Sequence, residues 1–548
     1  MSSCIFCRTP RPPFRLSSCL WTAVFSLAAG LGLVRPAAAQ VEPPRRWSFT
    51  TSGNAHELTP AATPDGGVVV LTPERLSAAG IRQAPPRVQK LSAAGELAWE
   101  RDLTWPGFAW PVVLDDGAVL AAEGDLAAQT GQLHCLEADG TVRWTVVTGG
   151  TPTAAPTLHA EGRIWIPVWN PPQGAELLQI GLAGEVEWRR EFGWASFGPG
   201  VSHADGQFLV LINGGLHSLN PDGSVRWAVG LPGASGTIPA VAADGTIVFT
   251  IMSPPPYGAF FLVNPDGSLR WSETVGMSLL EPVVDADGTV YLTRADGRLE
   301  VRDRRGALVR SINLPAPPAS GAVLAGAGRP WVSLRSGWVA GYDADGTPAV
   351  LARGGGNRDG GGAPLLRPDD VFVAGFSGRQ LIAFEGVGTP APGAWPMLAG
   401  NTARNGRQSP PPRPAAPSGL AATPEGESVR LRWEPAEDLV TYEVWRGVSP
   451  NPAAAVKVDG WQLSMDWQDP EVLTAGQDHW YWVRAHDAAG PGAFSAPVQV
   501  RREPPPPGGR VARIKLAPQL TSPPAPGPDG TLYRGAAGGP LAVAPARS

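Results

Sequence analysis

The chain has 548 residues, more than the roughly 250 to 300 at which a single hydrophobic core stops growing, so several folded units or a repeat architecture are expected. Its 68 Gly, 60 Pro and 21 Trp favour an all-β fold with many turns over a helical fold. The net charge of −5 comes without a basic stripe, which excludes nucleic acid as a partner because binding to phosphates requires concentrated positive charge.

The first 39 residues have the pattern of an export signal. Arg8, Arg11 and Arg15 precede the apolar run LWTAVFSLAAGLGLV, and the small-residue sequence RPAAAQ follows it. This order predicts a signal peptide at 1–39 with cleavage near Ala39, and the apolar run is short for a membrane span. No comparably long apolar segment follows, so we expect a mature protein without a transmembrane segment. We place it outside the cytoplasm of a bacterium, either secreted, periplasmic or at the cell surface.

Loss of the signal would leave Cys135 as the one cysteine of the mature chain. A single cysteine forms no internal disulfide, so the fold must depend on its core. We expect Cys135 to be a small buried strand residue, with an intermolecular bridge or a reactive thiol as the alternatives.

A repeated sequence follows the signal. NPDGSVRW at 220–227 and NPDGSLRW at 264–271 are nearly identical, and weaker copies also end in Trp. The repeat tryptophans are Trp47, Trp99, Trp144, Trp188, Trp227 and Trp271. They recur about every 45 residues, a period typical of repeat architectures. Two later units keep the period and carry Arg310 and Val350 in place of the tryptophan.

Each period contains Asp-Gly pairs between short alternating runs, as at 287–288 and 296–297. Asp-Gly supplies the positive φ that two-residue hairpin turns require, so about four antiparallel strands form per unit, which is one β-propeller blade. The eighth unit lacks a fourth strand. The segment RRWSFTT at 45–51 carries the repeat residue Trp47 of a fourth strand but precedes the first unit, so it has no unit of its own. We therefore predict an eight-bladed propeller at 45–400 whose last blade takes its outer strand from the N-terminal side, with seven blades as the alternative.

These units resemble the PQQ-like, or quinoprotein alcohol dehydrogenase-like, β-propeller repeat, whose units end in P-D-G-x-x-x-W. WPMLAGNTARNGRQ at 395–408 resembles a phrase found beside such propellers in exported bacterial proteins. The resemblance implies the fold and leaves the activity open, because quinone enzymes and non-catalytic scaffolds share the repeat. Quinone enzymes of this superfamily have longer blades, a disulfide between adjacent cysteines and Glu, Asn and Asp ligands for calcium. One mature cysteine excludes that disulfide, so we expect no cofactor.

No constellation typical of catalysis is evident. The histidines after the signal lack metal-ligand spacing, and G-x-S-x-G does not occur. The D-x-D-G strings at 285–288 and 343–346 lack the later acidic ligands of a calcium loop and are interpreted as hairpin turns. The sequence thus predicts no catalytic residue and no metal site. The carboxylates of a propeller glycosidase lie on separate blades and form no local sequence motif.

Aromatic residues occur in segments that a propeller places on one face. Segments 104–110 and 193–198 join consecutive blades, and segments 168–174 and 252–258 join a second strand to a third. The candidate ligand-binding residues are Trp105, Phe108, Trp110, Trp169, Trp194, Phe197 and Tyr257. Aromatic side chains beside polar loops suit carbohydrate or peptide recognition, and packing between blades is the alternative for each of them.

A Pro-rich linker is predicted at 401–413, and residues 414–502 resemble a fibronectin type III domain, a β-sandwich. Trp433 stands where that family keeps its buried Trp, and Tyr442, Val444, Tyr481 and Val483 alternate as core residues would. A second Pro-rich linker and a partial blade-like segment occupy 503–548.

The sequence favours an exported, non-enzymatic binding or scaffold protein. We expect a monomer whose propeller face recognises envelope polysaccharide or an envelope protein. One alternative is a scaffold like the propeller subunit of outer-membrane assembly machinery. Another is an enzyme, either a PQQ-dependent dehydrogenase or a propeller enzyme acting on glycosides.

Overall fold

The computed structural model describes residues 42–503 apart from short gaps, and residues 525–526, 532–536 and 539–543. The gaps are 54–57, 78–81, 108, 160–161, 196, 214, 230–235, 252–257, 276–278, 355–361, 377–378, 392–394, 409–411 and 437–438. The expected signal peptide at 1–39 lies outside the described residues. The elements of the described part are β-strands and two short 3₁₀ helices, η1 (Gly326–Gly328) and η2 (Pro452–Ala454). Neither of these helices is long and apolar enough to cross a membrane.

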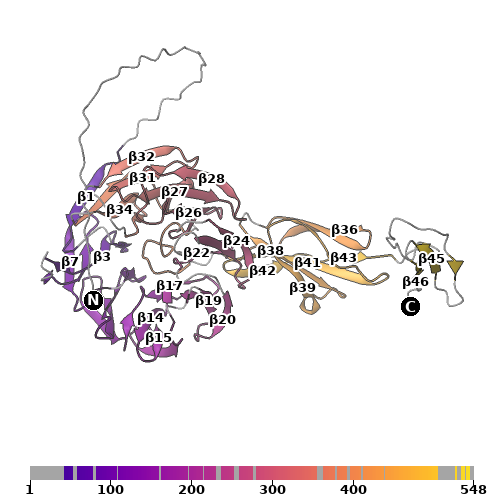
Figure 1. The fold of residues 1–548 in the computed structure, drawn as a ribbon, viewed down its shortest axis with the longest axis horizontal. Helices are drawn as coiled ribbons and strands as arrows, with labels where there is room; N and C mark the ends of the chain where they lie inside the picture. The colour runs from indigo at the N-terminus through magenta and orange to yellow at the C-terminus, as the bar shows by residue number, and fades with distance from the viewer. Residues whose placement is uncertain are drawn as a thin grey trace, which may run out of the picture. The chain divides into compact units, whose positions relative to one another are not determined.

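Between Arg45 and Glu385 the described residues form eight antiparallel sheets, named I to VIII in chain order (Figure 1). Sheet I contains β2 (Ala61–Ala62), β3 (Val68–Thr72), β6 (Arg87–Leu91) and β7 (Leu97–Asp102). Sheet II contains β8 (Val112–Val113), β9 (Val119–Asp125), β10 (Thr130–Leu136) and β11 (Val142–Val147). Sheet III contains β12 (Thr151–Pro152), β13 (Thr157–Leu158), β14 (Ile164–Asn170), β15 (Gly174–Ile180) and β16 (Val186–Glu191). Sheet IV contains β17 (Phe197–Ser202), β18 (Phe208–Ile212), β19 (Gly215–Leu219) and β20 (Val225–Val229).

The second half repeats this plan. Sheet V contains β21 (Ala240–Val241), β22 (Ile247–Ile251), β23 (Ala259–Val263) and β24 (Leu269–Thr274). Sheet VI contains β25 (Val283–Val284), β26 (Val290–Arg294), β27 (Arg298–Arg302) and β28 (Leu308–Asn313). Sheet VII contains β29 (Val323–Ala325), β30 (Arg329–Ser333), β31 (Trp338–Tyr342) and β32 (Pro348–Arg353). Sheet VIII contains β33 (Leu365–Arg367), β34 (Val371–Phe376), β35 (Gln380–Glu385) and β1 (Arg45–Thr50), and a separate ribbon pairs β4 (Arg75–Leu76) with β5 (Arg82–Ala84).

The outer strand of sheet VIII comes from the N-terminal side, as the sequence predicts. β1 pairs antiparallel with β35, and Phe49 faces Leu381. One core cluster joins sheets VII, VIII and I, because Trp331, Phe372 and Val70 all belong to it. Sheet VIII is therefore the neighbour of both the first and the seventh sheet.

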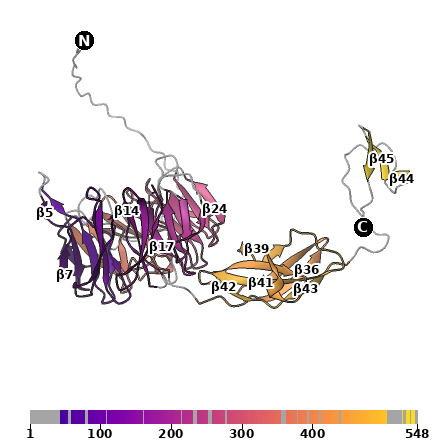
Figure 2. The ribbon, with the colours of Figure 1, turned by 90° about the horizontal axis from the view of Figure 1, so that it is seen from below.

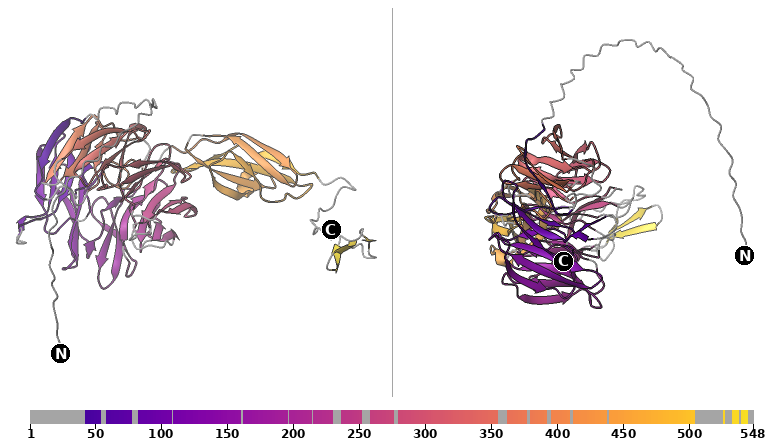
Figure 3. Two further views of the ribbon diagram at one scale, coloured as in Figure 1. Left: turned by 45° about the horizontal axis from the view of Figure 1, so that its top comes forward. Right: turned by 90° about the vertical axis from the view of Figure 1, so that its left-hand side faces the viewer.

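Burial differs between the inner and outer strands of each sheet. The middle strands β14 and β15 are buried almost throughout, whereas β16 alternates between exposed and half-buried residues. Strands buried on both faces are expected where sheets pack face to face. Figure 2 and the two views of Figure 3 show the succession of these sheets from other sides.

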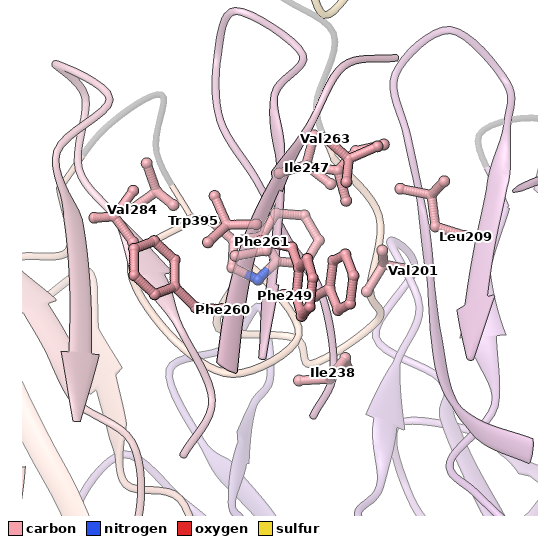
Figure 4. Close-up of a cluster of buried hydrophobic side chains, with 14 of the residues drawn as sticks. Val201, Leu209, Ile238, Ile247, Phe249, Phe260, Phe261, Val263, Val284 and Trp395 are labelled. Carbon is pink, nitrogen blue, oxygen red and sulfur yellow. The ribbon is translucent and has the colours of Figure 1, made fainter. Parts of the chain in front are cut away.

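One of the cores lies between sheets IV, V and VI (Figure 4). The rings of Phe249 and Phe261 stack there at 4.9 Å between centroids and an interplanar angle of 9°. Trp395, which follows the last sheet in sequence, is 1% exposed and belongs to the same cluster. The chain after sheet VIII therefore returns to the interior of the sheet assembly.

We call residues 395–408 the axial segment, because they bond to the inner edge of every sheet. Backbone N–H groups of six sheets donate to its carbonyls, from Ala62 to Thr402, Val113 to Ala403, Leu158 to Asn405, Ser202 to Gly406, Val284 to Trp395 and Leu324 to Pro396. For sheet V, the Gln408 amide donates to the Ala242 carbonyl at 2.9 Å. For sheet VIII, the Arg404 guanidinium donates to the Ala363 carbonyl just before β33 at 3.4 Å. Residues 401–408, which the sequence places in the linker, thus belong with the sheets.

Two further sheets form from residues 418–501. β36 (Ser418–Glu425), β37 (Ser428–Glu434) and β40 (Asp466–Gln468) make one of them. The other contains β38 (Thr441–Gly447), β39 (Val456–Gln462), β41 (Asp478–Asp487), β42 (Gly490–Phe494) and β43 (Val498–Arg501). Their shared core includes Tyr442, Val444, Tyr481 and Val483, which alternation in the sequence assigns to it, and Trp433, which the resemblance assigns to it. Near the C-terminus, β44 (Ala525–Pro526), β45 (Leu532–Ala536) and β46 (Gly539–Val543) form a small sheet.

Candidate binding surfaces

Antiparallel order gives sheets I to VIII two distinct ends. The turns from first to second and from third to fourth strand lie at one end, which we call the hairpin face; it includes 63–66, 92–95 and 114–117. The connections from second to third strand and between consecutive sheets lie at the other end, which we call the loop face; it includes 104–107, 171–173 and 192–195.

Trp194 is the clearest candidate on the loop face. Its side chain is 75% exposed, although Trp normally buries most of its surface. It contacts Trp169 edge to face, with 5.2 Å between ring centroids and an interplanar angle of 68°. Two backbone hydrogen bonds fix the loop that carries Trp194. The Ala175 N–H donates to the Gly193 carbonyl at 2.7 Å, and the Phe192 N–H donates to the Ala175 carbonyl at 2.8 Å.

The base of this aromatic pair is part of the core. Trp169, Phe192 and Phe197 pack against a buried cluster that includes Trp165 and Phe208. Phe192 and Phe197 contact each other edge to face at 5.2 Å. Trp169 lies in β14 and Phe197 is the first residue of β17, so both are strand residues although the sequence places them in connecting segments. The structure therefore brings Trp169, Trp194 and Phe197 into one region and leaves Trp194 with the largest open surface.

Trp105 and Trp110 are held by different contacts. Glu123 accepts hydrogen bonds from the backbone N–H groups of Thr104 and Trp105 at 2.7 and 2.9 Å. The Trp110 indole donates to the Arg404 carbonyl at 3.2 Å and packs against two core clusters, which is a structural role. Trp105 is half-buried on the loop face. The two remaining candidates, Phe108 and Tyr257, lie outside the described residues.

A buried polar pair supports the Trp105 loop. His134 Nε2 lies 2.9 Å from Glu123 Oε1, and His134 Nδ1 lies 2.9 Å from Thr145 Oγ1. Burial by itself would raise the pKa of Glu123, but the hydrogen bonds from His134, Trp105 and Thr104 outweigh it and lower that pKa. Glu123 is therefore an ionised acceptor that fixes the loop backbone.

The axial segment carries a buried cation that sequence patterns do not reveal. Arg404 has no exposed surface, and its guanidinium donates to the carbonyls of Leu398 at 2.6 Å, Pro60 at 3.2 Å, Ala363 at 3.4 Å and Pro364. Its burial lowers the pKa of Arg404 to about 9. The resemblance of residues 395–408 to a sequence found beside related propellers did indicate that the axial segment belongs with the sheets. That resemblance did not reveal the contacts of the axial segment with sheets I to VIII.

The hairpin face contains cavities. One of about 580 Å³ lies between sheets VIII, I and II and includes Asp65, Asp115, Arg367 and Asp369 in its wall. Another of about 580 Å³ includes Asp285, Tyr291 and Arg310. Burial raises the pKa of Asp285 despite its hydrogen bonds from Thr289, Asp287 and Tyr291. Within the described part of the chain, no three His, Cys, Asp or Glu side chains are grouped so as to hold a metal ion.

Residues 169–395 match the family PQQ_2, described as "Outer membrane protein assembly factor BamB". No curated protein matches the chain. Among solved structures, the Dos1 propeller has a TM-score of 0.50 at 9% identity, covering 64% of this chain and 97% of its own. BamB from Moraxella catarrhalis has a TM-score of 0.46 at 14% identity and covers 63% of this chain and 99% of its own. The family match and the Dos1 likeness together support a PQQ-like β-propeller, and identities this low carry the fold alone.

Proposed function

We propose that this chain, with its PQQ-like β-propeller, is an exported binding or scaffold protein of the bacterial envelope. In this proposal sheets I to VIII are the eight blades of one ring, and residues 414–502 are a fibronectin type III domain that extends the scaffold. The family description of an outer membrane assembly factor supports an assembly-like role. The partner is an envelope protein or polysaccharide, and a protein partner fits the loop face better.

The exposed Trp194 beside Trp169 carries this proposal. Exposed tryptophans with a packed base are typical of interface hot spots, because the ring buries a large area at little cost in conformational entropy. The axial segment bonds to the first strands next to their hairpin turns, at the opposite ends from the loop face. Trp105 on its Glu123-anchored loop offers a second aromatic contact on that face.

The experiment is an affinity capture from envelope extract with the full chain immobilised. Trp194→Ala is compared with wild type and with Leu126→Ala, since Leu126 is 63% exposed in the connection between β9 and β10 and is not aromatic. We expect Trp194→Ala to lose the partners that wild type and Leu126→Ala both retain. Equal capture by all three proteins would contradict the proposal.

A further inference from the structure

The cavity between sheets VI and VII lies where the repeat loses its tryptophan. Between sheets V and VI, the Trp271 indole covers Gly306, and a Cβ at that glycine would lie 2.6 Å from the ring. One sheet further, Arg310 takes the position of the tryptophan, and its Cδ would lie 2.8 Å from a Cβ at Gly346. Arg310 forms part of the cavity wall, and the volume of about 580 Å³ falls within the roughly 300 to 1,000 Å³ of ligand pockets. A departure from the repeat thus coincides with a space of ligand size.

Acidic side chains outnumber basic ones in the wall of this cavity. Asp285, Asp287 and Asp303 line it together with Arg310. None of the three carboxylates forms an ion pair with a residue that the structure describes. Burial raises the pKa of Asp285, but even a protonated Asp285 leaves two carboxylates against one guanidinium. The charge of the wall therefore favours a cationic ligand and disfavours an anionic one.

Two acceptor oxygens in this wall share a single donor. The Tyr291 hydroxyl lies 2.9 Å from the Gly328 carbonyl oxygen and 3.2 Å from Asp285 Oδ2. A phenol carries one proton, so it serves one of these oxygens and leaves the other without it. Asp285 is 7% exposed, and its Oδ1 already accepts from the backbone N–H groups of Asp287 at 3.0 Å and Thr289 at 2.9 Å. Because an acceptor without a donor is costly at a buried position, a ligand that brings N–H groups would stabilise this arrangement.

We propose that this cavity binds a small organic molecule with a primary ammonium group. An ammonium has one positive charge and three N–H donors, so it donates both to Asp285 Oδ2 and to the Gly328 carbonyl. The carbon chain of the ligand lies against Val301, Val309 and Ala391, the apolar part of the wall. The proposal does not depend on the loop face, because hairpin turns at the opposite ends of the strands surround this cavity.

The test is calorimetric titration of the full chain with 1,4-diaminobutane, butane-1,4-diol and succinate. The three molecules share one carbon skeleton and differ in end groups, which are ammonium, hydroxyl and carboxylate. We expect the diamine to bind at least about tenfold more tightly than the diol, and succinate to bind least. Failure of the diamine to bind at about 10 mM, or equal binding of the diol, would overturn the proposal.

A matched pair of aspartates tests the charge of the wall. Asp287 and Asp345 hold the same place in the D-A-D-G turns at 285–288 and 343–346, and both are exposed. Of the two, only Asp287 lines the cavity. Asp287→Asn is expected to weaken diamine binding at least about fivefold, because the ligand loses a facing carboxylate, while Asp345→Asn leaves it unchanged. The same affinity in both variants would overturn the proposal.

A second pair of variants tests the place of the site. Arg310→Trp restores the repeat tryptophan and fills the cavity, so it is expected to weaken diamine binding at least about tenfold. Val350→Trp restores the other missing repeat tryptophan, which packs against a different core cluster, and is expected to leave binding unchanged. Thermal unfolding shows that each variant is folded. Unchanged or tighter binding by a folded Arg310→Trp variant would overturn the proposal, and the aspartate pair remains decisive if that variant does not fold.

Discussion

Trp99 of sheet I lies against Gly140 in the third-to-fourth turn of sheet II. A Cβ at Gly140 would come within 2.7 Å of the indole, and the Trp99 Nε1 donates to the Ala138 carbonyl of that turn at 2.9 Å. Trp144 and Gly184, and Trp227 and Gly267, repeat this arrangement between later sheets. The Trp and the Asp-Gly turn of the repeat are thus partners across neighbouring sheets.

Gly140→Ala is expected to destabilise the protein more than Gly206→Ala. Both glycines have a φ of +88°, so alanine suffers similar backbone strain of about 1 to 2 kcal/mol at each. At Gly140 the added Cβ also meets the Trp99 indole, and this overpacking adds about 1 to 3 kcal/mol. At Gly206 nothing lies within 4 Å of the added Cβ. Urea unfolding of both variants measures the difference, and equal losses would contradict the Trp–Gly contact.

The repeat predicted much of the fold and little of the surface. Asp-Gly turns and the Trp period predict the strands of sheets I to VII, because turn chemistry is local. The pairing of β1 with β35 followed from the unmatched strand at 45–51 and the missing fourth strand of the eighth unit. The contact of Trp99 with Gly140 links neighbouring repeats, so alternation within one repeat does not reveal it. Arg310, which replaces the repeat Trp, still donates to the Ala344 carbonyl of the next turn.

The candidate site was harder to predict. Aromatic residues in connecting segments indicated Trp169 and Trp194, which the structure brings into contact. The same signal also selected Trp110, whose indole packs inward on the axial segment. Whether an aromatic side chain is exposed depends on contacts that are distant in sequence. Trp110 and its acceptor Arg404 are 294 positions apart, so no local sequence pattern indicates their hydrogen bond.

Arg404→Met is expected to cost at least about 3 kcal/mol of stability, because four buried carbonyl acceptors lose a charged donor. Arg407→Met in the same segment is the control. Arg407 forms an ion pair with the exposed Asp115 and should cost less than about 1 kcal/mol. Thermal unfolding of the two variants compares them. A small effect at Arg404 would contradict a stabilising role for its four carbonyl contacts.

Asp65→Asn is expected to give a pH-dependent loss. Burial would raise the pKa of Asp65, but hydrogen bonds from Lys90, Thr63 and Gly67 outweigh it and lower that pKa to about 2. Since the pKa in the unfolded chain is about 3.9, the stabilisation is full above that pH and disappears as the pH falls toward 2. Asparagine also leaves the buried Lys90 without its carboxylate, so after solvent screening we expect a loss of about 1 to 2 kcal/mol at pH 7.

Asp102→Asn is the matched control for this prediction. The side chains of Asp65 and Asp102 are both 59% exposed, but the partner of Asp102 is the more exposed Arg87. Urea unfolding at pH 7 and at pH 2.5 should show a loss for Asp65→Asn that shrinks at the lower pH, and little loss for Asp102→Asn at either. A loss for Asp65→Asn that stays constant with pH would exclude its carboxylate as the cause.

The most direct test of the proposed binding role is photo-crosslinking in envelope preparations with a photoreactive phenylalanine at position 194 or at position 182. Trp194 is 75% exposed on the loop face, and Leu182 is 47% exposed in a hairpin turn at the other ends of the strands. The account predicts a discrete adduct from position 194 that is absent from position 182. Adducts from neither position, or the same adduct from both, would contradict a partner site at Trp194.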